Sequence, residues 1–492
     1  MSKRKKEMLI ASLALLALLA VFAVLVLTKD KEEENPSETR SEVDDTSVML
    51  YEHEQTDITN IRIENEYGGY DIKGESSESS ESSNSMVWTI EEFDGLPVMS
   101  SSLGTTATNA AALTANSLVE ENCTDLSKFG LDTPAAKAEI SFVTGTTQTV
   151  YVGDETPLGS QYYVRMNGDK NVYTVAETFV SAYFNPKESY LNCLIIADIG
   201  DDELYPEISE LSVTRKDLQE PIIVTPLSVA DRAITTNPED ASVSSSFSDY
   251  KLVSPVKASI DFSKQGSLLF GMYGLSADHA VSAYPTEEQK NTCGINDPFC
   301  VVEMKLSEGG SSKLIVGNSF EADGITYYFA MLEGREIIYA FSEASLYWNT
   351  VEPMDFITRT TVMPYIYNIA NMEITAEDGT VYKFEQKDKL FYYNGNQLDD
   401  EKFKSFCQYL YKGIATGINY GEVEYKPSVT VKFSFTDTSI PDTTVGYQRT
   451  DTRSIYVAQD GSVDFTAQAK YLDRLLENVD NVINGKDILL SW

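Results

Sequence analysis

Residues 129–142 read FGLDTPAAKAEISF, and this stretch decides the fold because its pattern returns farther along the chain. The second copy is CGINDPFCVVEMKL at residues 293–306. In each copy a glycine stands four residues before a proline, Gly130 before Pro134 and Gly294 before Pro298. Apolar and polar residues then alternate, which predicts a half-buried antiparallel strand in both places.

The next motif keeps the same spacing. The distance in sequence from Gly130 to Gly153 is the same as the distance from Gly294 to Gly317. Gly153 and Gly317 each end a strand-like pattern, TVYVG and KLIVG. Tyrosines follow at corresponding places, and we expect them in strands: Tyr162, Tyr163 and Tyr173 in the first copy, and Tyr327, Tyr328 and Tyr339 in the second. Self-similarity at a fixed spacing indicates a duplicated module, so these glycines, prolines and tyrosines are predicted to be structural.

A third, looser copy lacks the paired glycine motif. It begins with IANMEITAEDGTVYKFE at residues 369–385, which resembles ITNIRIENEYGGYDIKGE at residues 58–75. Each copy closes with a short amphipathic stretch that favours a helix: AETFVSAYF, SEASLYW and TAQAKYLDRLLENV. The predicted fold class is α+β, with an N-terminal transmembrane helix followed by three repeated modules of antiparallel sheet with short covering helices. We place the modules at residues 58–190, 200–350 and 360–485, with a Ser-rich hairpin loop at 74–85.

The N-terminus carries an apolar segment at residues 8–27, MLIASLALLALLAVFAVLVL. A helix of that length spans about 30 Å of hydrocarbon. A cleaved signal peptide is the alternative, but its apolar core is usually shorter and ends at a small-x-small site, which the sequence lacks before Thr28. We therefore expect an uncleaved, single-pass anchor in the cell membrane.

Charge sets the predicted orientation of this anchor. The cytoplasmic end, residues 1–7, is basic, whereas the segment after the apolar stretch is acidic, and the positive-inside rule then places residues 28–492 outside. Polar, acidic residues 28–57 are predicted to be a tether between the membrane and the first module. The basic residues that decide this orientation are Lys3, Arg4, Lys5 and Lys6.

Composition and missing motifs exclude several kinds of function. A net charge of −38 opposes binding to nucleic acid, which relies on Lys and Arg. The two histidines, His53 and His279, are far apart, and no signature of a common hydrolase or nucleotide-binding loop is present. Acidic runs near Asp201, Asp399 and Asp460 resemble turns and helix caps more than calcium loops. We predict no catalytic residue, metal site or cofactor.

Five cysteines are present, and Cys293 and Cys300 bracket the turn GINDPF, so a disulfide between them is possible. The corresponding residues of the first copy are Phe129 and Ala136, an apolar pair. Buried free thiols that fill the same core sites are therefore an equal alternative. The tyrosine pairs could suggest a sugar-stacking face, but neighbours on a strand point to opposite sides, so at least one of each pair belongs to the core.

Residues 125–175, from DLSKFGLDTP to NVYTV, resemble the bacterial family known as domain of unknown function 4340, and residues 293–341 are similar to it more weakly. That resemblance implies a protein partner in the envelope, because members look like companions of ABC-type export systems. The predicted function is thus a non-enzymatic binding or assembly accessory of an envelope complex, with ABC-transporter subunits as the candidate partners. The alternatives are a cell-wall polymer or peptide hydrolase with a carboxylate pair, and an extracytoplasmic ligand sensor that acts through a partner.

Overall fold

The computed structural model describes residues 47–76, 86–200, 203–235, 247–361 and 363–492. The basic residues Lys3 to Lys6, the apolar segment 8–27 and residues 77–85 of the Ser-rich loop lie outside the described residues. In the part that is described, no helix has the length and apolarity needed to cross a membrane.

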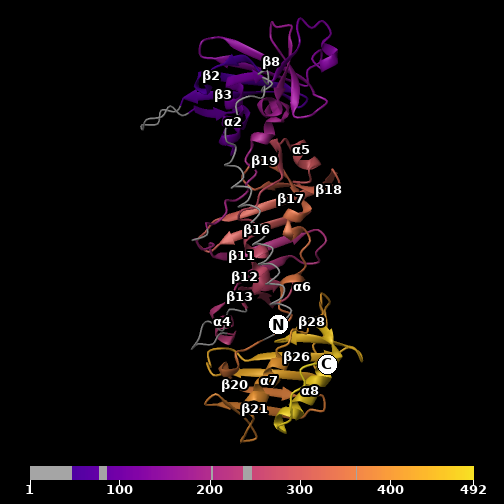
Figure 1. The fold of residues 1–492 in the computed structure, drawn as a ribbon. Helices are drawn as coiled ribbons and strands as arrows, with labels where there is room; N and C mark the ends of the chain where they lie inside the picture. The colour runs from indigo at the N-terminus through magenta and orange to yellow at the C-terminus, as the bar shows by residue number, and fades with distance from the viewer. Residues whose placement is uncertain (1–46, 77–85, 201–202, 236–246, 362) are drawn as a thin grey trace, which may run out of the picture.

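The molecule is an elongated stack of three sheet modules, which follow one another in chain order from indigo through orange to yellow in Figure 1. The prediction of a β-rich fold with antiparallel sheets and few helices is confirmed, because all strand pairs within the four sheets are antiparallel. Three sheets are large and belong to one module each, and the fourth is a two-stranded ribbon beside the first module.

The first module has an eight-stranded sheet in the order β4-β3-β2-β7-β8-β9-β10-β6. Its 3₁₀ turns include η1 (Gln55–Asp57), η3 (Leu126–Phe129), η4 (Ser181–Phe184) and η5 (Lys187–Tyr190). Its strands and helices are β1 (Val48–Glu52), β2 (Ile58–Asn65), β3 (Gly68–Ser76), β4 (Met86–Thr89), α2 (Ser100–Ala111), β5 (Ala112–Ala115), β6 (Ser117–Glu120), β7 (Ala136–Phe142), β8 (Thr147–Glu155), β9 (Gln161–Met166), β10 (Val172–Ala176) and α3 (Glu177–Val180).

The second module has a nine-stranded sheet in the order β14-β13-β12-β11-β16-β17-β18-β19-β15, with a helical turn η8 (Gly266–Phe270) and the 3₁₀ turns η9 (Glu343–Ser345) and η10 (Tyr347–Asn349). Its strands and helices are β11 (Ile208–Arg215), β12 (Ile222–Pro226), α4 (Val229–Thr235), β13 (Phe247–Ser254), β14 (Ala258–Asp261), β15 (His279–Ala283), α5 (Glu287–Thr292), β16 (Cys300–Leu306), β17 (Ser311–Ala322), β18 (Ile325–Leu332), β19 (Ile337–Ser342) and α6 (Pro353–Phe356).

The third module also has nine strands, in the order β23-β22-β21-β20-β25-β26-β27-β28-β24, and begins with the 3₁₀ turn η11 (Ile366–Asn368). Its strands and helices are β20 (Ile369–Thr375), β21 (Val381–Lys387), β22 (Leu390–Tyr393), β23 (Asn396–Gln397), α7 (Asp400–Leu410), β24 (Gly417–Ile418), β25 (Val429–Phe435), β26 (Thr443–Arg449), β27 (Ser454–Gln459), β28 (Ser462–Gln468) and α8 (Ala469–Ile483).

The three large sheets share one topology. The opening strands β2, β11 and β20 each pair with a strand that lies far ahead in the chain, β7, β16 and β25. In all three pairs the register shifts at the same place, directly after Ile58, Ile208 or Ile369. A shared strand order with a shared bulge makes the third module a structural equivalent of the other two, although it lacks their glycine motif.

Helices cover the sheets where apolar residues recur at helical spacing. In α7, Phe403, Phe406 and Leu410 are buried, and the side chain of Asp399 caps the helix by accepting a hydrogen bond from the Lys402 backbone N–H at 3.0 Å. The closing stretch of the second module forms the 3₁₀ turns η9 and η10 instead of an α-helix. The stretch is too short to hold more than one turn of each.

The predicted tether is wrong at its C-terminal end. Residues 48–52 form β1, which pairs with β5, and Tyr51 is buried with its hydroxyl donating to the Ala110 carbonyl at 3.1 Å. His53, which we placed in the tether, stacks on Phe142 with 3.9 Å between ring centroids. The described fold therefore begins at Val48, because VMLY supplies enough apolar surface to hold the chain against the first module.

A single hydrophobic core joins the modules. The buried residues that touch one another run without a break from Tyr51 in the first module to Val482 in the third. Since burial of apolar surface is the main stabilising term, this shared core stabilises the junctions as well as the modules.

Candidate functional site

The repeated glycines bring two loops against the sheet. A side chain at Gly153 would place its Cβ 2.1 Å from the carbonyl oxygen of Phe129, and one at Gly317 would place it 2.0 Å from that of Cys293. Gly130 and Gly294 both have a left-handed backbone, with φ of +67° and +75°. These glycines permit close contact of backbone with backbone, which is a structural role.

The loops seal a small apolar cluster on the outer face of each sheet. In the first module this cluster contains Phe129 and Leu131, and in the second it contains Cys293 and Ile295. Pro134 and Pro298, both half-buried, lead from these loops into β7 and β16. The glycine motif thus closes the outer face of the sheet rather than forming a site.

The predicted tyrosines divide between the two faces of the sheets. Tyr162 packs against Phe184, and its neighbour Tyr163 packs against Phe129, each with 4.9 Å between ring centroids. The sequence suggests that Tyr162 corresponds to Tyr327 and Tyr163 to Tyr328. The strand registers instead make Tyr162 equivalent to Tyr328 and Tyr163 equivalent to Phe329, an offset of one residue. The hairpin between β17 and β18 is two residues longer than the hairpin between β8 and β9, and this difference in length causes the offset.

The other tyrosines also have structural contacts. The Tyr327 ring lies between Phe320 at 5.5 Å and His279 at 5.9 Å, on the outer face of the second module. The Tyr173 hydroxyl donates to Asp169 at 2.8 Å, and burial raises its pKa. The hydroxyl of Tyr339, its equivalent in the second module, donates instead to the Asn192 carbonyl at 3.2 Å and so holds the first junction between modules.

The cysteines are free thiols in the structure, Cys293 and Cys300 included. Cys300 belongs to the main core, whereas Cys293 belongs to the small outer cluster. Burial raises the pKa of both thiols, that of Cys300 to about 12. Their arrangement matches the alternative of buried thiols, since the two side chains lie on opposite faces of the sheet.

Titratable side chains do not gather into a metal site in the part of the chain that the structure describes. No group of three or more His, Cys, Asp or Glu side chains there is placed to hold a metal ion. His53 lies in the first module and His279 begins β15 in the second, so they do not meet.

The first junction is a strand-like contact between modules. Residues 193–196 leave the first module and exchange backbone hydrogen bonds with the segment before β15, from Ala277 N to Cys193 O at 2.9 Å and from Ile195 N to Leu275 O at 2.7 Å. The Arg335 guanidinium adds a bond to the Leu194 carbonyl at 2.9 Å. Both modules are therefore held to one linker.

The second junction repeats this arrangement. Thr358 N donates to Ser259 O of the second module at 2.9 Å, and Ala415 N of the third module donates to Arg359 O at 3.1 Å. In the first module, β1 is the segment that leads into the module, and its Val48 pairs with Ala115 of β5. Every module is thus entered by a short extended segment that pairs beside its covering helix. We call these the entry segments: residues 48–52, 193–196 and 357–360.

A cavity of about 110 Å³ lies at the second junction. A partly buried ion pair crosses it, with 2.5 Å between Lys251 Nζ and Asp231 Oδ2. Burial disfavours the Asp231 carboxylate, but hydrogen bonds from Lys251 and Ser228 outweigh that effect and lower its pKa. The described lining comes from both modules and the linker: Leu227, Asp231, Ile234, Thr235, Ser248, Lys251, Lys257, Ala258, Ser259, Thr361, Met363 and Gln459.

The lining supplies one carboxylate, that of Asp231. Burial raises the pKa of another acid, Asp464, although a hydrogen bond from Ser462 and the charge of Lys257 each lower it. Asp464 is not among the residues that line the cavity. General acid and base catalysis by two carboxylates needs both to face one substrate. The described walls of this cavity do not offer that pair.

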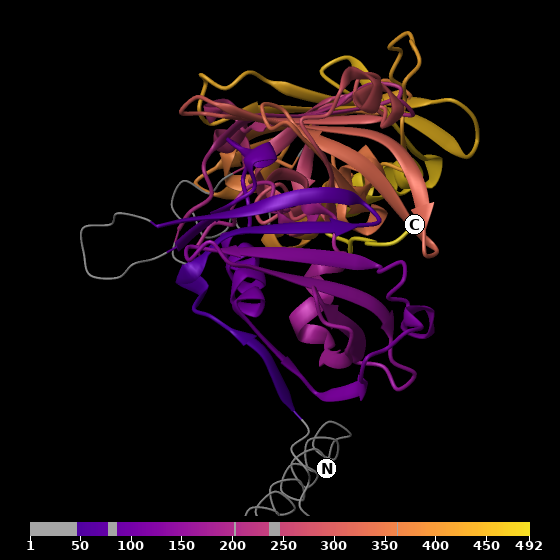
Figure 2. The same ribbon diagram turned by 90° about the horizontal axis from the view of Figure 1, so that it is seen from above.

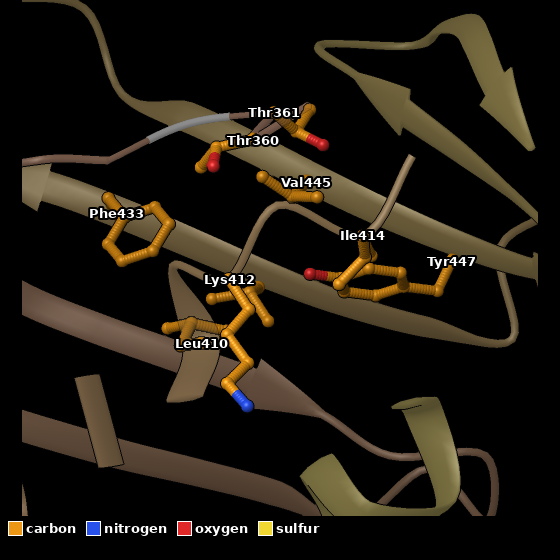
Figure 3. Close-up of a pocket in the computed structure, with 9 residues that line it drawn as sticks. Thr360, Thr361, Leu410, Lys412, Ile414, Phe433, Val445 and Tyr447 are labelled. Carbon is orange, nitrogen blue, oxygen red and sulfur yellow. The ribbon is translucent and has the colours of Figure 1, made fainter. Parts of the chain in front are cut away.

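A smaller gap of about 10 Å³ lies beside it in the third module (Figure 3). Thr360 and Thr361 are on one side and Leu410, Ile414 and Tyr447 on another, and the Lys412 side chain extends away from the threonines. A gap of this size holds one water at most. It is a packing space where the linker meets the third sheet.

Sequence reasoning missed the buried Arg215. Its guanidinium donates to the carbonyls of Trp348 and Val351, both at 2.9 Å, and pairs with Asp217 and Glu352 at 2.6 Å. Within ELSVTRKD an arginine reads as an exposed strand residue, and no local pattern distinguishes it. The ion pair ties β11 to the segment that leads into the third module.

Comparison with known proteins places a family match inside the first module. Residues 88–190 match the family model described as Domain of unknown function (DUF4340). The matched range runs from β4 to the 3₁₀ turn η5, just before the first junction. The resemblance expected from residues 125–175 is confirmed. No curated protein and no solved structure matches the chain.

Proposed function

We propose, starting from the match of residues 88–190 to the DUF4340 family model, that this protein is a non-enzymatic, membrane-anchored accessory of an envelope complex. Its partners would be subunits of a membrane transporter, and the ABC-type export systems implied by the family resemblance are the first candidates. The apolar segment 8–27 would hold it in the membrane, with the modules outside.

The observation that carries the proposal is the repeated use of entry segments. Three modules of one topology are joined by backbone hydrogen bonds at both junctions and by one continuous core. Such a body keeps its far end at a fixed distance from its near end, which suits a spacer or assembly protein better than a flexible tether would. The family match itself names no reaction.

Charge supports the same proposal. The full chain has a net charge of −38, so it is repelled by anionic lipid and nucleic acid and attracted to basic protein surfaces. Electrostatic complementarity speeds encounter and selects partners. A protein partner with a basic surface is the counterpart that this charge favours.

The test is crosslinking in native membranes, followed by capture of the tagged full-length chain and mass spectrometry. The control is a chain that keeps residues 1–46 but lacks residues 47–492. Transporter subunits recovered with the full chain and lost in the control would support the proposal. Their absence, or turnover of a cell-wall substrate that one point mutation abolishes without unfolding the protein, would overturn it.

A further inference from the structure

Residues 486–492, KDILLSW, form neither a helix nor a strand and lie against the helix pair α7 and α8 of the third module. Gly485, which has a left-handed φ of +62°, ends α8 and lets the chain turn back along it. We call residues 486–492 the strap. The end of the strap is marked C beside α8 in Figure 1, and Figure 2 marks the same end from above.

Asn478 of α8 binds the strap through the strap's backbone. Its side-chain amide donates to the Leu489 carbonyl, and its side-chain oxygen accepts from the Leu489 N–H, both at 2.9 Å. The Lys412 ammonium donates to the next carbonyl, that of Leu490. Because these hydrogen bonds use no side chain of the strap, any extended peptide could form them.

One side chain of the strap has specific contacts. Trp492 stands T-shaped against Tyr409 of α7 and Tyr471 of α8, with 5.9 and 5.6 Å between ring centroids. The Lys412 Nζ lies 4.9 Å from the centroid of the Trp492 ring. These contacts favour an aromatic side chain three positions after the residue that Asn478 binds. We call Tyr409, Lys412, Tyr471 and Asn478 the platform.

The platform is held together without the strap. The Tyr409 hydroxyl donates to the Tyr471 carbonyl, and the Tyr471 hydroxyl donates to the Leu410 carbonyl, both at 3.0 Å. The two tyrosine rings stack with 5.3 Å between their centroids. These contacts join α7 to α8 directly, so the two helices keep their arrangement when the strap leaves. The Asn478 amide can then form hydrogen bonds with water.

The strap itself is only partly buried, although it is apolar. Leu489, Leu490 and Trp492 are 39%, 40% and 40% exposed, whereas Asn478 beneath them is 0% exposed. A preformed surface that holds a partly buried peptide is the arrangement expected for a ligand that can be exchanged.

We propose that the platform is a peptide-binding site, which the strap occupies until an extended, apolar segment of a partner protein replaces it. The partner segment pairs its backbone with Asn478 and places an aromatic side chain on Tyr409 and Tyr471. A second copy of the chain is a poorer occupant, because it brings another 38 negative charges to the same place. The choice of a partner rests on the proposed function and deepens it, because it names the surface through which the accessory holds that partner.

The experiment measures the binding of a fluorescent peptide, with the sequence of residues 485–492, to the full-length chain in detergent micelles by anisotropy. Leu489→Pro frees the platform, because proline lacks the N–H that donates to Asn478. The matched control is Leu490→Pro, at a neighbouring residue of nearly equal exposure whose N–H does not donate to Asn478. The Leu489→Pro chain should bind the peptide roughly tenfold more tightly than the wild type or the control, since an intact strap competes at a millimolar effective concentration.

A second substitution tests whether the peptide binds at the platform. Adding Asn478→Leu to Leu489→Pro should abolish peptide binding, whereas adding Asn481→Leu, three residues farther along α8, should not. Thermal unfolding of each variant checks that the third module remains folded, and Trp492→Ala takes the place of Leu489→Pro if that variant does not fold.

Equal affinity of the wild type and both proline variants, or binding that survives Asn478→Leu, would overturn the peptide site. Dimers of the wild type joined through exchanged straps, seen by sedimentation, would overturn the choice of a partner in favour of a second copy. The peptide experiment uses purified protein, so its failure leaves the capture experiment and the proposed function standing. If the peptide binds as expected but no transporter subunit is captured, the proposed function fails and the peptide site stands.

Discussion

Asn65 and Arg215 occupy the same position in two equivalent sheets, and each donates hydrogen bonds to two backbone carbonyls of its own module's closing segment. Asn65 pairs with Ala136 and Arg215 with Cys300, so the strand registers coincide. The Asn65 amide reaches the carbonyls of Tyr183 at 2.9 Å and Asn185 at 2.8 Å, as Arg215 reaches those of Trp348 and Val351.

The third module ties its closing helix by another route. Arg449 links Glu377, which follows β20, to Asp473 on α8. Each sheet is thus fastened to the element that covers it, and in the first two modules that element leads directly into the next junction. These hydrogen bonds and ion pairs hold each closing element against the sheet of its own module.

Replacing Arg215 by Met should destabilise the second module by about 2–4 kcal/mol, because the buried carbonyls of Trp348 and Val351 lose their donors. Each module contains one tryptophan, Trp88, Trp348 or Trp492, so the change can be followed by the fluorescence of a variant that keeps only Trp348. The control is Arg62→Met, which removes half-exposed ion pairs to Glu64 and Asp71 and should cost under about 1 kcal/mol. Equal losses in the two variants would contradict the assigned role of Arg215.

Replacing Gly317 by Ala should destabilise the protein by more than about 2 kcal/mol, since the new Cβ would lie 2.0 Å from the Cys293 carbonyl oxygen. Gly104→Ala is the matched control. Gly104 lies inside α2, and nothing approaches the place of its missing Cβ, so alanine there should stabilise by about 0.5–1 kcal/mol. Thermal unfolding of both variants checks the pair, and a neutral Gly317→Ala would show that the loop does not press on β17.

The five thiols should be titratable after unfolding without any reductant. In the folded protein, burial raises the pKa of Cys300 and Cys407 to about 12, so both should react with a thiol reagent only when the protein opens. Cys193, which is partly exposed, should react first. Peptide mapping under non-reducing conditions gives the readout, and a peptide that joins Cys293 to Cys300 would refute the assignment.

The two acids at the second junction should respond to pH with opposite signs. The folded-state pKa of Asp231 is lowered, so its ionised form stabilises the protein above the unfolded pKa, and that contribution disappears as the pH falls through the folded pKa. Asp231→Asn should therefore lower the melting temperature at pH 7 and approach the wild type in acid.

The pKa of Asp464 is raised by burial, so ionising it costs stability at neutral pH, and Asp464→Asn should raise the melting temperature there. This gain should vanish as the pH falls, because both states then bind the proton. Melting curves of the two variants between neutral and acid pH test the pair together. Shifts of the same sign at pH 7 would contradict the environments described for these carboxylates.

Local signals in the sequence predict the sheets well but not the contacts between distant segments. Alternation in AKAEISF and CVVEMKL identifies β7 and β16, Gly130 marks a left-handed backbone, and Gly153 marks a close approach of two backbone segments. By contrast, SSSLGTTATNAA has weak helix propensity, yet it forms α2 because Leu103, Ala107 and Ala110 fall on one buried face. Burial against the sheet outweighs weak helix propensity.

The sequence does not predict the entry segments either, because they too depend on contacts between distant parts of the chain. The entry segments are short, differ in sequence and gain their meaning only by pairing beside a covering helix. No pattern in VMLYE or in residues 357–360 predicts that pairing. The backbone hydrogen bonds in the structure show that these entry segments are equivalent.

The most direct test of the account is the distance between the first and third modules in the full-length chain. Spin labels would be attached through unnatural amino acids at Val87 on β4 and Val381 on β21, both exposed strand residues, and measured by pulsed electron resonance. A stack joined by entry segments predicts one narrow distance distribution. A broad or multiple distribution would contradict it, because the modules would then move independently and could not act as a spacer of fixed length.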